Sequence, residues 1–196
     1  MNRLAWTLSL VAAFTGLWTT GCNSHGDNPK DKIAAVLHRA PYVSLTDSLD
    51  HAKGDEAAGL YFRRGDLLAH NNLHEIAADD FRRSWELRPD EMTGFRYAST
   101  LSIIGQTDRA ARLLKDCEKR YPENPSFPSI LGELYQQSGK WREALDTYNA
   151  MLEKDSGNFD AWYEKGLLLE KAQDTTGALG ALGKAYSLQP TNTYGL

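Results

Sequence analysis

The sequence predicts an all-α fold in which a hairpin of two helices occurs four times after residue 57. Three observations predict this fold. Six residue columns recur at offsets of 33, 34 and 34 positions, each copy carries two helical stripes of apolar residues, and turn-forming residues separate the two stripes. One such column would carry little weight, but six that move together indicate a structural repeat.

The first element in chain order is an apolar leader. Residues 1–21 begin with Met-Asn-Arg, continue with an uncharged run over 4–18 and end in Thr-Thr-Gly before Cys22. The run is shorter than the roughly 20 residues that span a bilayer, and its order is typical of a signal peptide. Gly21 directly before Cys22 resembles a bacterial lipoprotein signal, which implies removal of 1–21 and attachment of a diacylglyceryl group to the Cys22 thiol. Thr19 departs from that pattern, in which Leu is usual, and ordinary cleavage or an uncleaved anchor are the alternatives.

A polar tether and a helical cap are expected next. Residues 22–30 are polar and contain Gly and Pro, which is typical of a flexible segment. Residues 31–57 hold two short groups of apolar residues separated by Pro41, so we expect two capping helices, the second of which packs on the first repeat.

Two of the recurring columns hold small residues, and each small residue begins an apolar stripe at helical spacing. Helices that meet at Gly or Ala approach closely, so a larger residue there is expected to force them apart. The first column is Gly65, Ala98, Gly132 and Gly166, and the second is Ala77, Ala110, Ala144 and Ala178.

Four repeats are expected, at about 58–90, 91–124, 125–158 and 159–192. The pairs Asn71-Asn72, Gly105-Gln106, Gly139-Lys140 and Gln173-Asp174 suit the turns within the hairpins, and Pro89, Pro122 and Pro190 suit the helix ends.

The period and these columns resemble the tetratricopeptide repeat, and the fourth copy matches best, through Trp162, Gly166, Leu169, Ala178, Leu182, Ala185 and Pro190. The resemblance implies a right-handed superhelical stack. Arg64 departs from the usual apolar residue, and we expect it to pair with Asp80 across the hairpin, for about 1 kcal/mol or less if the pair is exposed.

The charge balance excludes several classes of partner. The chain has 22 basic and 26 acidic side chains, which gives no electrostatic reason to bind nucleic acid or anionic lipid. With two cysteines, one of them at the leader, no intramolecular disulfide framework is expected. Any membrane association is expected through the lipid anchor alone.

The residues that invite a chemical interpretation favour packing or solvent exposure instead. Residues 177–185 resemble a phosphate loop only loosely, because Ala178 and Ala185 stand where Gly and Ser or Thr are required. His70 and His74 are separated by a turn and have no third ligand at fixed spacing. Cys117 lies in a packing column. We therefore expect no catalytic residue, metal or cofactor, and no enzyme.

What remains is a surface. In the register of the resembled family, the first helix of each repeat lines a concave groove, and its inward positions include Phe62, Asp66, His70, Phe95, Ser99, Ile103, Glu133, Tyr163 and Leu167. The aromatic residues suit anchors for a peptide or helix, or else they fill the gaps between neighbouring repeats. Asp66 and Glu133 do not match the family's carboxylate clamp, so we do not expect a ligand with a free acidic end.

The function predicted is that of a non-catalytic, lipid-anchored adaptor that holds a protein or peptide partner in a bacterial cell envelope. Asn23, which is not the Asp of an inner-membrane retention signal, favours the periplasmic side of the outer membrane. An assembly or pilot factor for a pilus or secretin is the alternative, and an enzyme with an unfamiliar site is a third class. Because six residues follow Pro190, we expect the last helix to expose its outer face or to have it covered by a partner.

Overall fold

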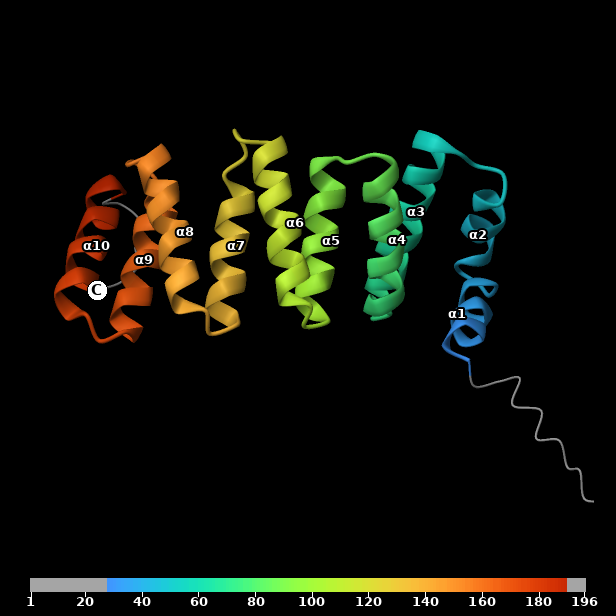
Figure 1. Cartoon of the computed structure of the whole chain (residues 1–196), viewed down its shortest axis with the longest axis horizontal. Helices are drawn as coiled ribbons and strands as arrows, with labels where there is room; N and C mark the ends of the chain where they lie inside the picture. The colour runs from blue at the N-terminus through green and yellow to red at the C-terminus, as the bar shows by residue number, and fades with distance from the viewer. Residues whose placement is uncertain (1–27, 190–196) are drawn as a thin grey trace, which may run out of the picture.

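The computed structural model describes residues 28–189, which form ten helices and no strand (Figure 1). The leader, Cys22, most of the expected tether and Pro190 lie outside the described residues. The helices are α1 (Pro29–Leu37), α2 (Val43–Leu49), α3 (Gly54–His70), α4 (His74–Leu87), α5 (Glu91–Ile103), α6 (Thr107–Arg120), α7 (Ser126–Gln137), α8 (Trp141–Lys154), α9 (Phe159–Lys171) and α10 (Thr175–Leu188).

The predicted all-α repeat is confirmed, since helices α3 to α10 form four hairpins at the expected places. Helices α1 and α2 occupy the predicted cap, and α2 packs against α3. The cap begins earlier than expected, because the Asn28 side chain accepts a hydrogen bond from the Lys30 backbone N–H at 3.1 Å and Pro29 starts α1. Pro29 and Lys30 therefore belong to a helix and not to the tether.

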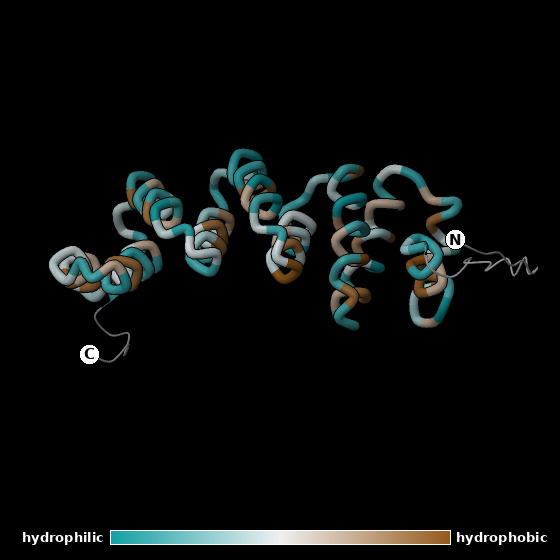
Figure 2. The backbone as a smooth tube through the Cα atoms, turned by 60° about the horizontal axis from the view of Figure 1, so that its bottom comes forward, coloured by the Kyte–Doolittle hydropathy of each residue, from teal (hydrophilic) through white to brown (hydrophobic). Residues whose placement is uncertain are grey.

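The hairpins stand side by side along the long axis of the molecule (Figure 1). The second helix of each hairpin packs against the first helix of the next, as α4 does on α5, α6 on α7 and α8 on α9. Successive helices from α5 to α9 alternate between two rows (Figure 2). We call the outer surface of the row of α3, α5, α7 and α9 the first-helix face, and that of α4, α6, α8 and α10 the second-helix face.

Each hairpin turns at one residue in the left-handed region of the backbone. Asn72, Gly105, Gly139 and Gln173 have φ values of 59°, 73°, 70° and 63°, and they lie one repeat apart. Gly and Asn tolerate this conformation at a helix C-terminus with little strain. The predicted turn pairs contain these residues, so their positions are confirmed.

The small-residue columns lie where the two helices of each hairpin approach most closely. Ala77, Ala110 and Ala144 are completely buried. A Cβ atom at Gly132 would lie 2.6 Å from the Tyr148 ring, and one at Gly166 would lie 2.6 Å from Leu182 Cγ. The absence of a side chain at these two glycines is therefore required by the packing.

The predicted pair between Arg64 and Asp80 is confirmed, and because both side chains are buried, the small contribution expected of an exposed pair does not apply. Arg64 Nε and one terminal nitrogen donate to the two Asp80 oxygens at 2.7 and 2.8 Å, and both side chains are buried. The other terminal nitrogen donates to Thr46 Oγ1 at 2.9 Å. Burial raises the pKa of Asp80, and the hydrogen bonds from Arg64 oppose that shift. This pair ties the cap to the first repeat.

Candidate functional site

The first-helix face carries an apolar stripe on α5. Met92, Phe95, Ser99 and Ile103 are spaced three or four residues apart and so share one side of the helix; we call them the α5 stripe. Met92, Phe95 and Ile103 are 58%, 41% and 63% exposed. They are three of the eight large apolar side chains that are exposed among the described residues. The stripe is therefore a concentration of apolar surface on one helix.

Packing of the stack does not require this stripe. The opposite side of α5 supplies the contacts with α4 and α6, through the buried residues Thr93, Gly94, Tyr97, Ala98 and Leu101. Exposed apolar surface that contributes nothing to the core is typical of a binding surface.

A network of charged groups borders the stripe on the α3 side. Arg96 Nε lies 3.3 Å from Asp66 Oδ1, which joins α5 to α3. Both atoms are shielded from solvent and have no hydrogen bond within the described structure. Their mutual attraction is therefore the main interaction that offsets the free-energy cost of removing them from water. His70 Nδ1 lies 2.7 Å from the Asp66 carbonyl oxygen. The ion pair of Arg96 and Asp66 therefore joins the second repeat to the first beside the stripe.

The α7 and α9 side of the stripe is acidic. Partial desolvation and the nearby charge of Glu164 raise the pKa of Glu133. The Gln136 amide donates to Glu164 Oε2 at 3.0 Å and to Tyr148 Oη at 2.8 Å, so Gln136 belongs to a half-buried network between helices. Glu133 forms no ion pair with any residue in 28–189, which leaves its negative charge available.

The predicted groove residues fall into two groups: those on or beside the exposed α5 stripe, and those that are half-buried or packed against another ring. Phe95, Ser99 and Ile103 lie together on the α5 stripe, with Asp66 on the preceding helix of the row and Glu133 on the following one. Phe62 is half-buried, and its ring centroid lies 5.8 Å from that of Phe81, so it fills space inside the first hairpin. Tyr163 stacks on Phe159 along α9 with centroids 5.9 Å apart, and Leu167 is half-buried.

Sequence reasoning missed Met92 and Arg96. Met92 lies three residues before Phe95, so extending the helical spacing by one step finds it. Arg96 lies next to Phe95, which drew the prediction for this part of the helix. The ion pair of Arg96 with Asp66 depends on the distance between α3 and α5, which the sequence does not give.

Three kinds of feature outside the α5 stripe bear on function in the described residues: the thiol of Cys117, groups that could hold a metal ion, and helices that could span a bilayer. Cys117 is buried, and burial raises the pKa of its thiol to about 12, so it is neutral at physiological pH. No group of three or more His, Cys, Asp or Glu side chains in 28–189 is arranged to hold a metal ion. None of the helices in this range is both long enough and apolar enough to span a bilayer.

Comparisons with known proteins agree with this architecture. Residues 130–193 match the sequence model of the tetratricopeptide repeat. A tetratricopeptide repeat-containing protein of Treponema pallidum is 31% identical over 132 residues, which cover 57% of this chain and 16% of the relative. A peroxisomal targeting signal receptor of Kluyveromyces lactis is 30% identical over 81 residues, covering 41% of this chain and 14% of the receptor. The chain thus spans about a sixth of the length of these relatives.

Solved structures share the fold. YrrB, described as a tetratricopeptide-repeat protein with an unusual peptide-binding site, superposes with a TM-score of 0.60 at 20% identity, over 83% of this chain and 81% of YrrB. MamA from Desulfovibrio magneticus RS-1 superposes with a TM-score of 0.61 at 18% identity, over 84% and 94% of the two chains. The fold is therefore a stack of tetratricopeptide-type hairpins, and the third and fourth hairpins also carry the sequence pattern of that repeat.

Proposed function

We propose that the protein is a non-catalytic adaptor that holds a partner protein on the first-helix face of its repeats. Tetratricopeptide repeats generally serve protein-protein interaction, and a peptide-binding member is among the structural neighbours. The observation that carries the proposal is the α5 stripe, because its apolar side chains are exposed without contributing to the stack.

The chemistry of the border defines the partner. The α7 and α9 side of the stripe carries carboxylates, whereas Asp66 on the α3 side is paired with Arg96, so the stripe suits an amphipathic helix or extended segment that presents apolar residues and at least one basic residue towards α7 and α9. Glu133 and Glu164 disfavour a segment with a free acidic end, in the same way as the pair of Asp66 and Glu133 that the sequence indicated.

We propose further that the adaptor is tethered to a bacterial envelope membrane through lipidated Cys22, on the periplasmic side of the outer membrane. The support is the resemblance of residues 1–22 to a lipoprotein signal. Acyl chains contribute about 0.8 kcal/mol for each buried methylene, which is sufficient for two or three chains to hold a domain on a membrane. A pilot or assembly factor for a pilus or secretin is a narrower form of this function, with a partner that fails to multimerise when the protein is absent.

The test is partner capture in cells. A photo-crosslinking amino acid at position 99 places the reactive group at the centre of the α5 stripe. We expect a crosslinked partner, identified by mass spectrometry, whose yield falls about tenfold or more in a Phe95→Ala, Ile103→Ala double variant, because the apolar anchors are lost.

The control variant is Tyr186→Ala, which removes an exposed large apolar side chain from α10, away from the stripe. It is expected to leave the yield unchanged. Equal yields from the double variant and the wild type would show that the first-helix face does not hold the partner.

A further inference from the structure

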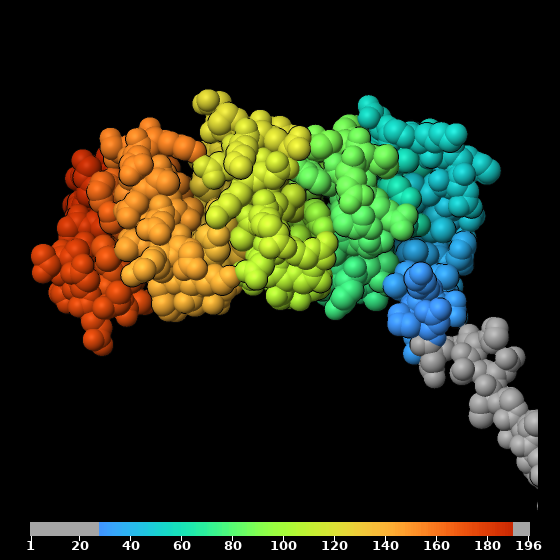
Figure 3. Space-filling view, viewed as in Figure 1, coloured from blue at the N-terminus to red at the C-terminus, as the bar shows by residue number. Residues whose placement is uncertain are grey.

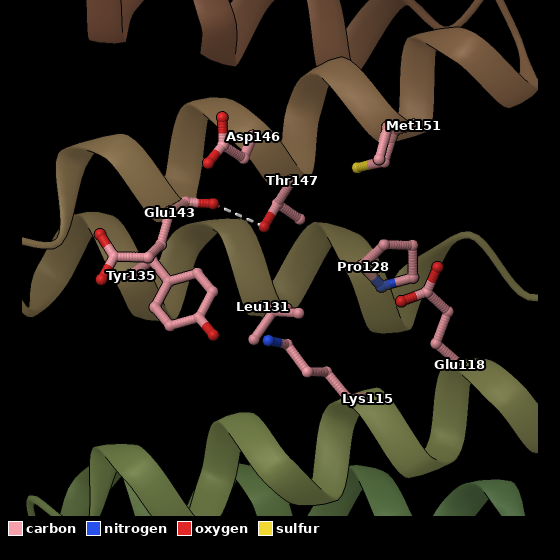
Figure 4. Close-up of a pocket in the computed structure, with 10 residues that line it drawn as sticks. Lys115, Glu118, Pro128, Leu131, Tyr135, Glu143, Asp146, Thr147 and Met151 are labelled. Carbon is pink, nitrogen blue, oxygen red and sulfur yellow. Dashed lines mark hydrogen bonds between the residues drawn. The ribbon is translucent and has the colours of Figure 1, made fainter.

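A furrow of about 290 Å³ opens on the second-helix face, between α6 and α8 with α7 as its floor (Figures 3 and 4). Leu131 and Tyr135 of α7 form the floor, and Lys115 of α6 points in towards them (Figure 4). Pro128 and Met151 close one end. Glu118 lies on the α6 wall, and Glu143 and Asp146 on the α8 wall. We call this the acidic furrow.

The same furrow recurs one repeat earlier, between α4 and α6 over α5, with a volume of about 260 Å³. Seven of its lining residues occupy the same repeat positions as residues of the acidic furrow. The equivalent pairs are Arg82 and Lys115, Trp85 and Glu118, Tyr97 and Leu131, Leu101 and Tyr135, Arg109 and Glu143, Arg112 and Asp146, and Leu113 and Thr147. We call the earlier one the basic furrow.

The floors of the two furrows are chemically alike. Each pairs one tyrosine with one leucine, in opposite order along the helix. A cation lies against the tyrosine in both: Arg109 donates to Tyr97 Oη at 2.8 Å, and Lys115 Nζ lies 5.8 Å from the centroid of the Tyr135 ring. A basic side chain can lie against a floor of this kind, as Lys115 does, but a second cation there needs carboxylates nearby to offset the positive charge already present.

The walls formed by the later helix of each furrow, α6 in the basic furrow and α8 in the acidic furrow, carry opposite charges. Arg109 and Arg112 line the basic furrow, and Glu143 and Asp146 stand in their places in the acidic furrow. Glu143 and Asp146 are exposed and form no ion pair with any described residue, whereas Glu118 on the other wall is paired with Lys154. One repeat later the same positions hold Gly177 and Gly180. The hairpin therefore forms with arginine, carboxylate or no side chain at these positions, and folding does not require the two carboxylates.

We propose that the acidic furrow binds a segment of a partner protein that carries a lysine or arginine next to an apolar residue. The methylenes of the basic side chain lie on Leu131 and Tyr135, and its head lies between the carboxylates of Glu143 and Asp146. The neighbouring apolar residue packs against Pro128 and Met151. The basic furrow repels the same segment, so the charge reversal between adjacent repeats fixes the register in which the segment binds.

Selection of random peptides displayed on phage, panned against the purified full-length chain, tests this proposal. Wild-type protein is expected to enrich peptides with a Lys or Arg beside an apolar residue. A Glu143→Arg, Asp146→Arg double variant, which recreates the wall of the basic furrow, is expected to bind those peptides at least about tenfold more weakly in calorimetric titration, and to enrich acidic peptides instead.

Two further variants make the result specific. Glu143→Gln with Asp146→Asn keeps the shape and removes the charge, and it is expected to lose the basic peptides without gaining acidic ones. Glu153→Arg with Asp160→Arg makes the same change of net charge at exposed positions outside the furrow, and is expected to bind as wild type does.

Three outcomes would overturn the proposal: no enrichment of basic peptides, equal binding by the two arginine double variants, or a loss of binding caused by Phe95→Ala with Ile103→Ala instead. The last outcome would place the peptide on the α5 stripe, and so separates this proposal from the proposed function of the first-helix face.

Discussion

Single residues in this molecule act by joining elements that are distant in sequence. Arg64 is the clearest example, since its guanidinium reaches Asp80 on the partner helix and Thr46 in the cap. Such a pair is costly to bury and costly to break, because removal of one partner leaves the other charge buried without compensation. The sequence predicts the pair through its facing positions, but not its burial, which depends on α2 covering the first hairpin.

We expect Asp80→Ala to lower the free energy of unfolding by about 3–5 kcal/mol, because Arg64 then remains buried and unpaired. Replacement of both residues, by Arg64→Met with Asp80→Leu, is expected to restore most of that loss. Asp79→Ala, which breaks exposed pairs with Arg82 and Arg83, serves as the control at about 1 kcal/mol or less. Chemical denaturation measures all three, and a single variant no less stable than the control would contradict the burial argument.

Cys117 predicts a dependence of stability on alkaline pH. Its thiol has a pKa of about 12 in the folded protein, against an ordinary value of 9.0. Because the folded-state pKa is raised, the stabilisation is complete below about pH 9 and is lost as the pH rises towards 12, where only the unfolded chain ionises freely. We expect denaturation midpoints to fall over this range, and to fall less steeply in Cys117→Ala. Identical slopes for the two proteins would assign the alkaline loss to other groups, such as Tyr97 and Tyr148, whose pKa values are also raised by burial.

At the scale of elements, the packing of each hairpin depends on the positions at which its two helices approach most closely. The hairpin of α9 and α10 contains both extremes, since Gly166 faces Leu182 with no space for a Cβ atom, whereas Gly180 on the outside of α10 has nothing within 4 Å of that position. Position in the pair, and not residue type, therefore decides whether a glycine is required.

The same substitution at these two glycines is expected to have opposite effects. Gly166→Leu overcrowds the contact with Leu182 and is expected to cost about 3 kcal/mol. Gly180→Leu replaces a poor helix former at an open position and is expected to add about 0.5–1 kcal/mol. Thermal unfolding followed by circular dichroism compares the two variants, and effects of the same sign would argue against the register of the hairpin.

At the scale of the whole molecule, the sequence was most informative about what is local and repeated. A period of 33 or 34 residues with turn residues inside it predicts each hairpin directly, since every contact within a hairpin is close in sequence. Helix α3 starts at Gly54, four residues before the predicted repeat, and its first turn carries Asp55 and Glu56, acidic residues that favour a helix N-terminus and that the columns do not include.

The site was less predictable, because it depends on what non-adjacent elements leave uncovered. Helical spacing placed Phe95 and Ile103 on one face, yet the same spacing placed Phe62 there, and only the Phe81 ring distinguishes a packed side chain from a free one. The furrows open between second helices that belong to different repeats. The repeating residue positions do not give the distance between the second helices of neighbouring repeats.

The tether is a prediction about the whole chain. We expect Cys22→Ala to move the protein from the membrane fraction to the soluble fraction of cells, because no acyl chain is then attached. Cys117→Ala is the matched control, and it is expected to remain with membranes. Continued sedimentation of Cys22→Ala with membranes would remove the lipid anchor from the proposed function.

The hydrogen bonds of Thr46 also have a mechanical consequence. Its Oγ1 atom lies within hydrogen-bond distance of the Leu37 and Tyr42 carbonyl oxygens, and it accepts a hydrogen bond from Arg64. One hydroxyl group therefore links the cap to the first hairpin. Helix α1 has no fully buried side chain, and only its half-buried Val36 and Leu37 pack against the core. If the protein is pulled by its N-terminal end against a held partner, we expect α1 to detach first, because its contacts with the other helices are few, and the hydrogen bonds of Thr46 then carry the load. The repeats would therefore bear tension only after a short, compliant segment has extended.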